Sequence, residues 1–102
     1  MRSVCHSDLV HLGRMLLAQP PHRRPVICAR AFYEAHAADK YRRVYGRAHP
    51  GFGDGSLASW ASQHACPPEP RPPEPSLSDP DYAACLMLVL REVLTRADPA
   101  LA

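Results

Sequence analysis

Three observations on the sequence predict an all-α fold, a compact domain of four helices. Apolar residues recur at three- and four-residue spacing in several stretches, which is the period of a helix buried on one side. No stretch alternates apolar and polar residues as a half-buried strand does. Glycine and proline lie between the periodic stretches, where they mark helix ends and turns. A length of 102 residues fits a single domain over residues 1–102 with a thin core.

The first helix is expected from about Asp8 to Ala18, because leucines recur there at helical spacing. Ser7 precedes it, and its hydroxyl can accept a hydrogen bond from a free amide of the first turn. Asp8 suits the positive end of the helix dipole. Pro20 and Pro21 then end the helix.

The second helix is expected from Pro25 to about Tyr45. Proline suits the first turn, where its missing N–H would have no helical partner. The stretch is rich in alanine, so a neighbouring helix can approach closely. Asp39 and Arg43 stand four residues apart and can pair on the outside. Gly46 is placed to adopt the left-handed conformation that ends many helices.

The stretch "RAHPGFGDGSLASW" over residues 47–60 is interpreted as a bend followed by a short third helix. Its glycines supply backbone angles that other residues avoid. Ser56 or Asp54 can cap the helix, which is expected over about Leu57 to His64. Trp60 and Ala61 are expected to face inward.

A proline-rich extended connector is predicted over residues 67–78, because seven of the twelve prolines lie between Cys66 and Asp81. Its PxxP spacings could also serve as a ligand for an aromatic groove. Asp79 as cap and Pro80 at the first helical position then predict a fourth helix to about Ala97. That helix is apolar nearly all round, which predicts the most buried helix of the fold or one at a subunit interface.

Charge is unevenly distributed along the chain. Residues 1–47 carry nine Lys and Arg against three Asp and Glu, a net charge of +6. Residues 48–102 carry three against seven, a net charge of −4. The two halves can attract each other, or the first half can face an anionic partner.

A cytoplasmic location without membrane contact is expected. The amino-terminal "MRSVCHSDLV" lacks the apolar core of a secretory signal, and the apolar run from Tyr82 to Leu90 is too short to span a bilayer. The four cysteines are therefore expected as thiols, with Cys28 and Cys85 on apolar helical faces.

Three groups of residues suggest chemistry, and each also has a structural explanation. "GFGDGS" resembles a phosphate loop, but no strand precedes it and no G-K-S/T follows it. His49, Asp54 and Ser56 could form a catalytic set, although a turn and a helix cap explain the same residues. Zinc would need Cys5, His6, His64 and Cys66, whose pairs are unlike the usual paired ligands. The sequence thus predicts a non-enzymatic protein with no catalytic residue, cofactor or metal.

An interaction surface is the remaining candidate for function. Arginine forks suit phosphates and carboxylates, and three tyrosines are interleaved with them on the second helix. An unidentified protein partner is predicted, with a second copy of the chain as one choice. Nucleic acid is the alternative, bound by the arginines and tyrosines. The residues assigned to this surface are Arg23, Arg24, Arg42, Arg43, Arg47, His49, Asp54 and Ser56.

The stretches "YRRVYGRAHPGFGDGSL" and "LSDPDYAACLMLVL" resemble a small family of uncharacterised alphaproteobacterial proteins of about this length, with an HPxFGDGSL…SDPDY pattern. The resemblance covers most of the chain except the proline-rich connector, which is longer than the family pattern implies. It implies one short, cytoplasmic bacterial domain. It assigns no catalytic or binding residue.

Overall fold

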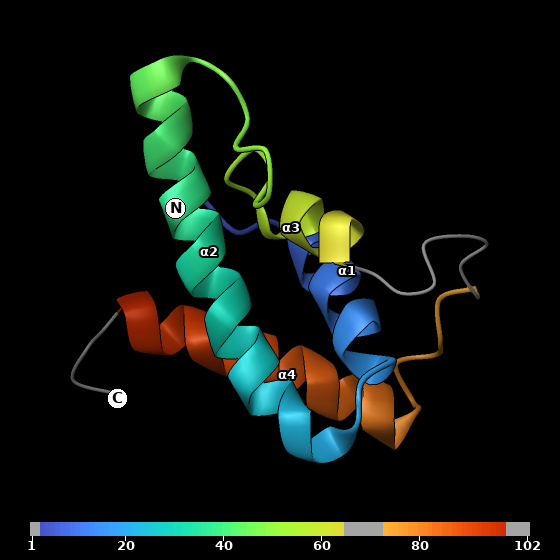
Figure 1. Cartoon of the computed structure of the whole chain (residues 1–102). Coiled ribbons are helices and arrows are strands. Elements are labelled where there is room, and N and C mark those ends of the chain that lie inside the picture. The colour runs from blue at the N-terminus through green and yellow to red at the C-terminus, as the bar shows by residue number, and fades with distance from the viewer. Residues whose placement is uncertain (1–2, 65–72, 98–102) are drawn as a thin grey trace.

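The computed structural model describes residues 3–64 and 73–97, and these residues form four α-helices (Figure 1). The helices are α1 (His6–Leu17), α2 (Arg24–Tyr45), α3 (Leu57–His64) and α4 (Pro80–Ala97), with a 3-10 turn η1 (Pro21–Arg23) before α2. Within the described residues there is no strand, only an isolated bridge between His49 and Gly53. The predicted all-α, four-helix class is confirmed.

Two long helices set the shape of the molecule. In Figure 1, α2 rises along one side, and α4 runs across the base beneath α1 and α2. α1 packs against both α3 and α4, and α3 also contacts α2. The glycine corner, residues 46–56, carries the chain from the far end of α2 back to the start of α3.

The core lies where the four helices meet. Burial of large side chains drives this packing, at roughly 1.5–3 kcal/mol for each one. Ala31 and Ala35 of α2 are buried in this core. α1 and α4 approach closely at Gly13, where an added Cβ would lie 2.6 Å from a Leu86 methyl carbon. The buried cluster comprises Leu12, Leu16, Cys28, Ala31, Phe32, Ala35, Leu57, Trp60, Ala61, Cys85 and Val89.

Several predicted helix ends are confirmed. Gly46 adopts φ 69° and donates to the Arg42 carbonyl at 2.8 Å, which ends α2. At the start of α4, Asp79 Oδ1 accepts from the amides of Asp81 at 2.9 Å and Tyr82 at 3.3 Å. The bounds of α3 are those predicted.

The start of α1 differs from the prediction. The helix begins at His6, with Cys5 as the cap residue, so Ser7 lies inside the first turn. The Asp8 carboxylate reaches back to the Cys5 amide at 3.0 Å. Asp8, the third residue of the helix, thus supplies the acceptor for an amide at the helix start. The sequence spacing alone fits Ser7 or Asp8 in this role.

The prediction that α4 is the most buried helix is wrong. Its buried residues are Tyr82, Cys85, Leu86 and Val89, which form one side only. Met87, Leu90 and Leu94 are exposed on another side. Three helices cannot surround a fourth in a chain of this size, so part of an all-apolar helix stays uncovered.

The predicted connector over residues 67–78 lies partly outside the described residues. In residues 73–78 the backbone has no regular helix, and a turn precedes α4. The buried Tyr82 hydroxyl donates to Glu74 at 2.9 Å, which holds this part of the connector against α4. Burial and this hydrogen bond raise the pKa of Tyr82 to about 12.

Candidate interaction surfaces

Several backbone amides of the glycine corner donate to acceptors in the corner or in α3. Those of Gly51 and Phe52 both donate to His49 Nδ1 at 3.0 Å. The Gly53 amide donates to the His49 carbonyl, and the Asp54 amide donates to Ser59 Oγ at 3.2 Å. A phosphate loop needs amides directed together at an anion, and these amides are directed elsewhere. The geometry is that of a bend.

The Ser56 and Asp54 side chains cap α3. The Ser56 hydroxyl donates to Asp54 Oδ1 at 2.7 Å and accepts from the Ser59 amide at 3.2 Å. The Ser56 amide donates to the same carboxylate oxygen at 2.9 Å. A serine nucleophile needs a base on its hydroxyl. Here the Ser56 hydroxyl is part of a helix cap and His49 Nδ1 accepts from two corner amides, so His49 and Ser56 do not form a base–nucleophile pair.

Aromatic rings connect the corner to the end of α2. His49 stacks on Phe52 at 4.4 Å between ring centroids and packs edge-on to Tyr41 at 4.9 Å. Tyr41 in turn contacts Tyr45 at 4.5 Å. Aromatic pairs at such distances stabilise by about 0.5–1.5 kcal/mol beyond area burial. The ring series holds the corner against α2.

Asp8 joins the starts of two helices, a role the sequence did not reveal. Its Oδ2 accepts from the Cys5 amide, and its Oδ1 accepts from the Ala58 amide of α3 at 2.9 Å. The carboxylate is buried at the positive ends of both helix dipoles. The partner lies fifty residues away in the sequence, so no local spacing could signal it.

Arg24 was assigned to the interaction surface, and this is wrong because its side chain is buried. Arg24 Nε donates to the carbonyls of Leu16 at 3.0 Å and Gln19 at 3.1 Å, and Nη2 donates to Leu17 at 3.1 Å. The Leu16 and Leu17 carbonyls belong to the last turn of α1, and the Gln19 carbonyl follows it. Carbonyls at a helix end lack the usual amide partner four residues on, and of these three only that of Leu16 also accepts from a backbone amide in the described residues, the Gln19 amide at 3.0 Å. The guanidinium therefore caps α1 and fixes the start of α2 beside it.

A second buried acid, Glu34, links α2 to α3. Trp60 Nε1 donates to its Oε1 at 2.9 Å, and Arg30 Nε donates to its Oε2 at 2.8 Å. Burial tends to raise the pKa of Glu34, but the hydrogen bonds from Arg30 and Trp60 outweigh it, so the pKa is lowered. His64 stacks on Trp60 at 4.1 Å between centroids. The cluster fixes the central tryptophan.

The remaining candidate residues are divided between the two ends of α2. Arg42, Arg43 and Arg47 are exposed around its carboxyl end, near the half-buried His49. Arg23 is exposed at the other end, about 30 Å away by the rise of a 22-residue helix. The predicted pair is present, with Arg43 2.9 Å from Asp39, but Asp39 is buried against the corner rather than outside.

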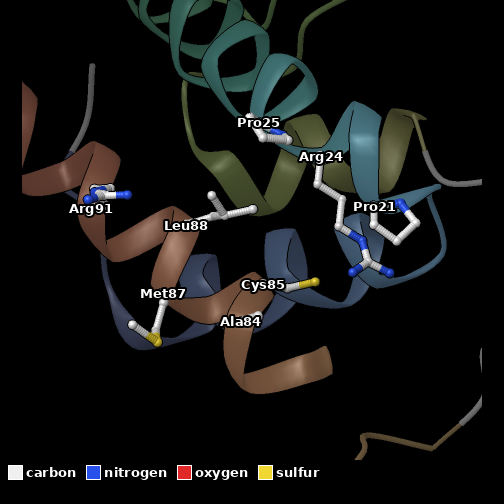
Figure 2. Close-up of a pocket in the computed structure, with 8 residues that line it drawn as sticks. All are labelled: Pro21, Arg24, Pro25, Ala84, Cys85, Met87, Leu88 and Arg91. Carbon is white, nitrogen blue, oxygen red and sulfur yellow. The ribbon is translucent and has the colours of Figure 1, made fainter. Parts of the chain in front are cut away.

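An apolar surface on α4 lies apart from the residues predicted for the interaction surface. Met87, Leu90 and Leu94 are exposed there. Beside Met87 lies a groove of about 510 Å³ between α4 and the start of α2 (Figure 2). The groove is lined by Pro21, Arg24, Pro25, Ala84, Cys85, Met87, Leu88 and Arg91.

The cysteines in the described residues are free thiols. Cys28 and Cys85 are buried, as predicted, and burial raises the pKa of Cys28 to about 12. Cys66 of the candidate zinc set lies outside the described residues. In residues 3–64 and 73–97 no three metal-ligating side chains come together. No helix in these ranges is both long and apolar enough to cross a bilayer.

Together these features define a small all-α domain whose polar motifs are used in capping and whose apolar and basic residues lie on open helix faces. A family model described as "Domain of unknown function (DUF7742)" matches residues 2–93. The chain belongs to this family. The resemblance to a family without an assigned activity is thereby confirmed. No curated protein and no solved structure matches the chain significantly.

Proposed function

We propose that this chain is a non-enzymatic protein that acts by binding another protein through exposed residues of α2 and of the corner that follows it. The proposal includes the bacterial origin and cytoplasmic location that the sequence predicts. The supporting observation is the distribution of charge on α2. Both acids of the helix are buried, Glu34 with 8% and Asp39 with 4% of its surface exposed.

The exposed charge of α2 is therefore entirely positive. Residues 40–53 include no acidic residue, and Arg42 and Arg47 are exposed there. Three apolar or aromatic side chains of α2 are also exposed to solvent, those of Val26, Tyr33 and Val44. A surface with apolar contacts and positive charge around them fits an acidic protein surface with apolar residues at its centre.

The test compares what the full chain retains from the cytoplasm of its native host. Arg42→Glu with Arg47→Glu reverses charge at the carboxyl end of α2. Arg91→Glu, on α4, is the matched control for an exposed arginine elsewhere. Proteins retained by wild type and by Arg91→Glu are expected to be lost from the double variant. Quantitative mass spectrometry of the retained proteins measures this loss. Equal retention by wild type and the double variant would rule the surface out, provided that circular dichroism shows both folded.

Nucleic acid is the second candidate, favoured by the rings of Tyr41 and Tyr45 beside exposed arginines. Phosphate contacts release counterions, so such binding falls steeply with salt. A labelled oligothymidine and a labelled duplex should show no salt-sensitive anisotropy change with the wild-type chain if the partner is a protein. A strong anisotropy change at low salt that is lost in the Arg42→Glu, Arg47→Glu variant would favour nucleic acid as the partner instead of a protein.

A further inference from the structure

We infer that the groove between α2 and α4 binds a small aliphatic carboxylate, a hydrocarbon chain that ends in one carboxylate group. The groove has a volume of about 510 Å³, within the range of about 300–1,000 Å³ that is typical of small-molecule sites. It lies at the other end of α2 from Arg42 and Arg47, so this inference and the protein-binding proposal stand or fall separately. Arg91 belongs to the groove alone, so Arg91→Glu remains a control for protein binding.

The lining of the groove favours a hydrocarbon chain. Apart from two arginines, the lining side chains carry no nitrogen or oxygen atom; they belong to Pro21, Pro25, Ala84, Cys85, Met87 and Leu88. A sugar or a nucleobase placed here would find hydrogen-bonding side chains only at the two arginines, and its other polar groups would lose water without replacement. The lining residues of α4 run from Ala84 to Arg91, about 10 Å along the helix axis, which an extended chain of about eight carbons matches.

Arg24 gives the groove a fixed donor for an anion. Only 9% of its surface is exposed, and its Nε and Nη2 donate to carbonyls at the end of α1, which holds the guanidinium in place. Its Nη1 makes no hydrogen bond to any residue that the structure describes. In Figure 2 the guanidinium points from α2 toward Cys85 on α4. A carboxylate oxygen in the groove would accept from Nη1 in partly desolvated surroundings, which strengthen a charged hydrogen bond.

The charge of the groove is positive. Arg91, the second arginine, is exposed beyond Leu88 (Figure 2) and forms no ion pair within the described residues. The lining includes no acidic residue in this part of the chain. Both acids of α4 lie outside the lining, since Glu92 pairs with Arg96 at 2.9 Å and Asp81 is in the first turn. The groove also adjoins the first residues of α2, where the helix dipole favours negative charge. These charges select an anion over a neutral or a cationic group.

The two arginines have different roles in this arrangement. Arg24 holds the carboxylate, because its guanidinium is fixed and mostly buried. Its one free terminal nitrogen serves a single oxygen, which suits a monoanion better than a phosphate group. The hydrocarbon chain then lies along Ala84 and Leu88 toward Arg91. The exposed Arg91 adds positive charge and a smaller contribution to affinity.

Methyl NMR of the full chain during titration with octanoate tests the ligand and its place. The methyl signals of Met87 and Leu88 should shift with one common dissociation constant of about 1 mM or less. The signal of Leu94, an exposed apolar residue of α4 outside the groove, should not shift. Octanol, which has the same chain without the charge, should bind at least about ten-fold more weakly. Unchanged signals of Met87 and Leu88, an equal shift of Leu94, or equal affinity for octanol would each overturn the inference.

An exposed alanine in the groove gives a variant that should fold. Ala84→Phe fills the groove with a larger side chain and should abolish the octanoate-dependent shift of Leu88. Ala97→Phe, at an exposed alanine near the end of the same helix, is the matched control and should bind octanoate like wild type. If Ala84→Phe bound octanoate as well as Ala97→Phe did, the ligand would not occupy the groove.

The arginine variants test the role of charge. Arg91→Gln should weaken octanoate binding about two- to five-fold and leave octanol binding unchanged. Lys40→Gln, which removes one positive charge of α2 away from the groove, should change neither. Arg24→Gln also removes the cap of α1, so circular dichroism must first show that it folds. Folded Arg24→Gln should lose the preference for octanoate over octanol, and retention of that preference would contradict Arg24 as the anchor. If Arg24→Gln does not fold, equal octanoate binding by Arg91→Gln and wild type contradicts the selection by charge.

Discussion

Gly55→Ala is expected to lower the free energy of unfolding by about 2–6 kcal/mol, a large part of the stability of a domain this size. Gly55 has φ 101°, a conformation that costs a side-chain-bearing residue about 1–3 kcal/mol. An added Cβ would also lie 2.9 Å from both Cα and Cβ of Asp39. Because Asp39 Cα is helix backbone, α2 and the corner must separate, which adds about 1–3 kcal/mol.

Two other glycines separate the two contributions. Gly46 also has positive φ, at 69°, but no atom lies within 4 Å of its added Cβ, so Gly46→Ala should show the conformational cost alone. Gly51→Ala has neither problem and should change stability little. Urea unfolding of the three variants gives the comparison. If Gly55→Ala lowered the free energy of unfolding no more than Gly46→Ala, close packing of the corner against α2 at Gly55 would be contradicted.

Asp8→Ala is expected to cost about 2–4 kcal/mol, because one carboxylate satisfies amides at two helix starts. Each capping interaction contributes about 0.5–2 kcal/mol. Loss of the carboxylate also leaves the Ala58 amide without its acceptor at 2.9 Å, and a buried amide without a partner costs about 1–3 kcal/mol. Asp8→Asn should lie between Asp8→Ala and wild type, since one oxygen remains as an acceptor.

Ser7→Ala is the control for this prediction, because the sequence alone makes Ser7 the cap of the first helix. Ser7 lies exposed inside the first turn, so its loss should change stability by less than about 0.5 kcal/mol. Chemical unfolding followed by circular dichroism measures both variants. Equal losses from Ser7→Ala and Asp8→Ala would contradict the double-capping role of Asp8.

Local chemistry made much of the fold predictable. The Asp79-Pro80 start of α4, the Gly46 end of α2 and the bounds of α3 each depend on residues within a few positions of one another. The start of α1 was misplaced because Ser7 and Asp8 can both satisfy first-turn amides. The Ala58 amide of α3, which donates to Asp8 in the folded chain, explains why an aspartate stands at position 8. That contact is not visible in the local sequence.

The candidate surface was less predictable, since exposure depends on distant packing. Arg24 follows Arg23 in the same basic stretch, yet its guanidinium is buried and donates to carbonyls at the end of α1. In a count of charges Glu34 and Asp39 offset part of the positive charge of α2, whereas their burial leaves basic residues as the only charged side chains exposed on that helix. The apolar pattern of α4 required burial but could not say that only one side would be covered by this chain.

Amide hydrogen exchange in the corner is the most direct test that its glycine pattern is a structural bend rather than an anion site. The amides of Gly53, Asp54 and Ser56 should exchange at least about ten-fold more slowly than in an unstructured peptide, because each donates to an acceptor in the corner or in α3. Inorganic phosphate should leave these rates unchanged. Free-peptide rates for these amides, or protection that appears only with phosphate, would contradict the bend.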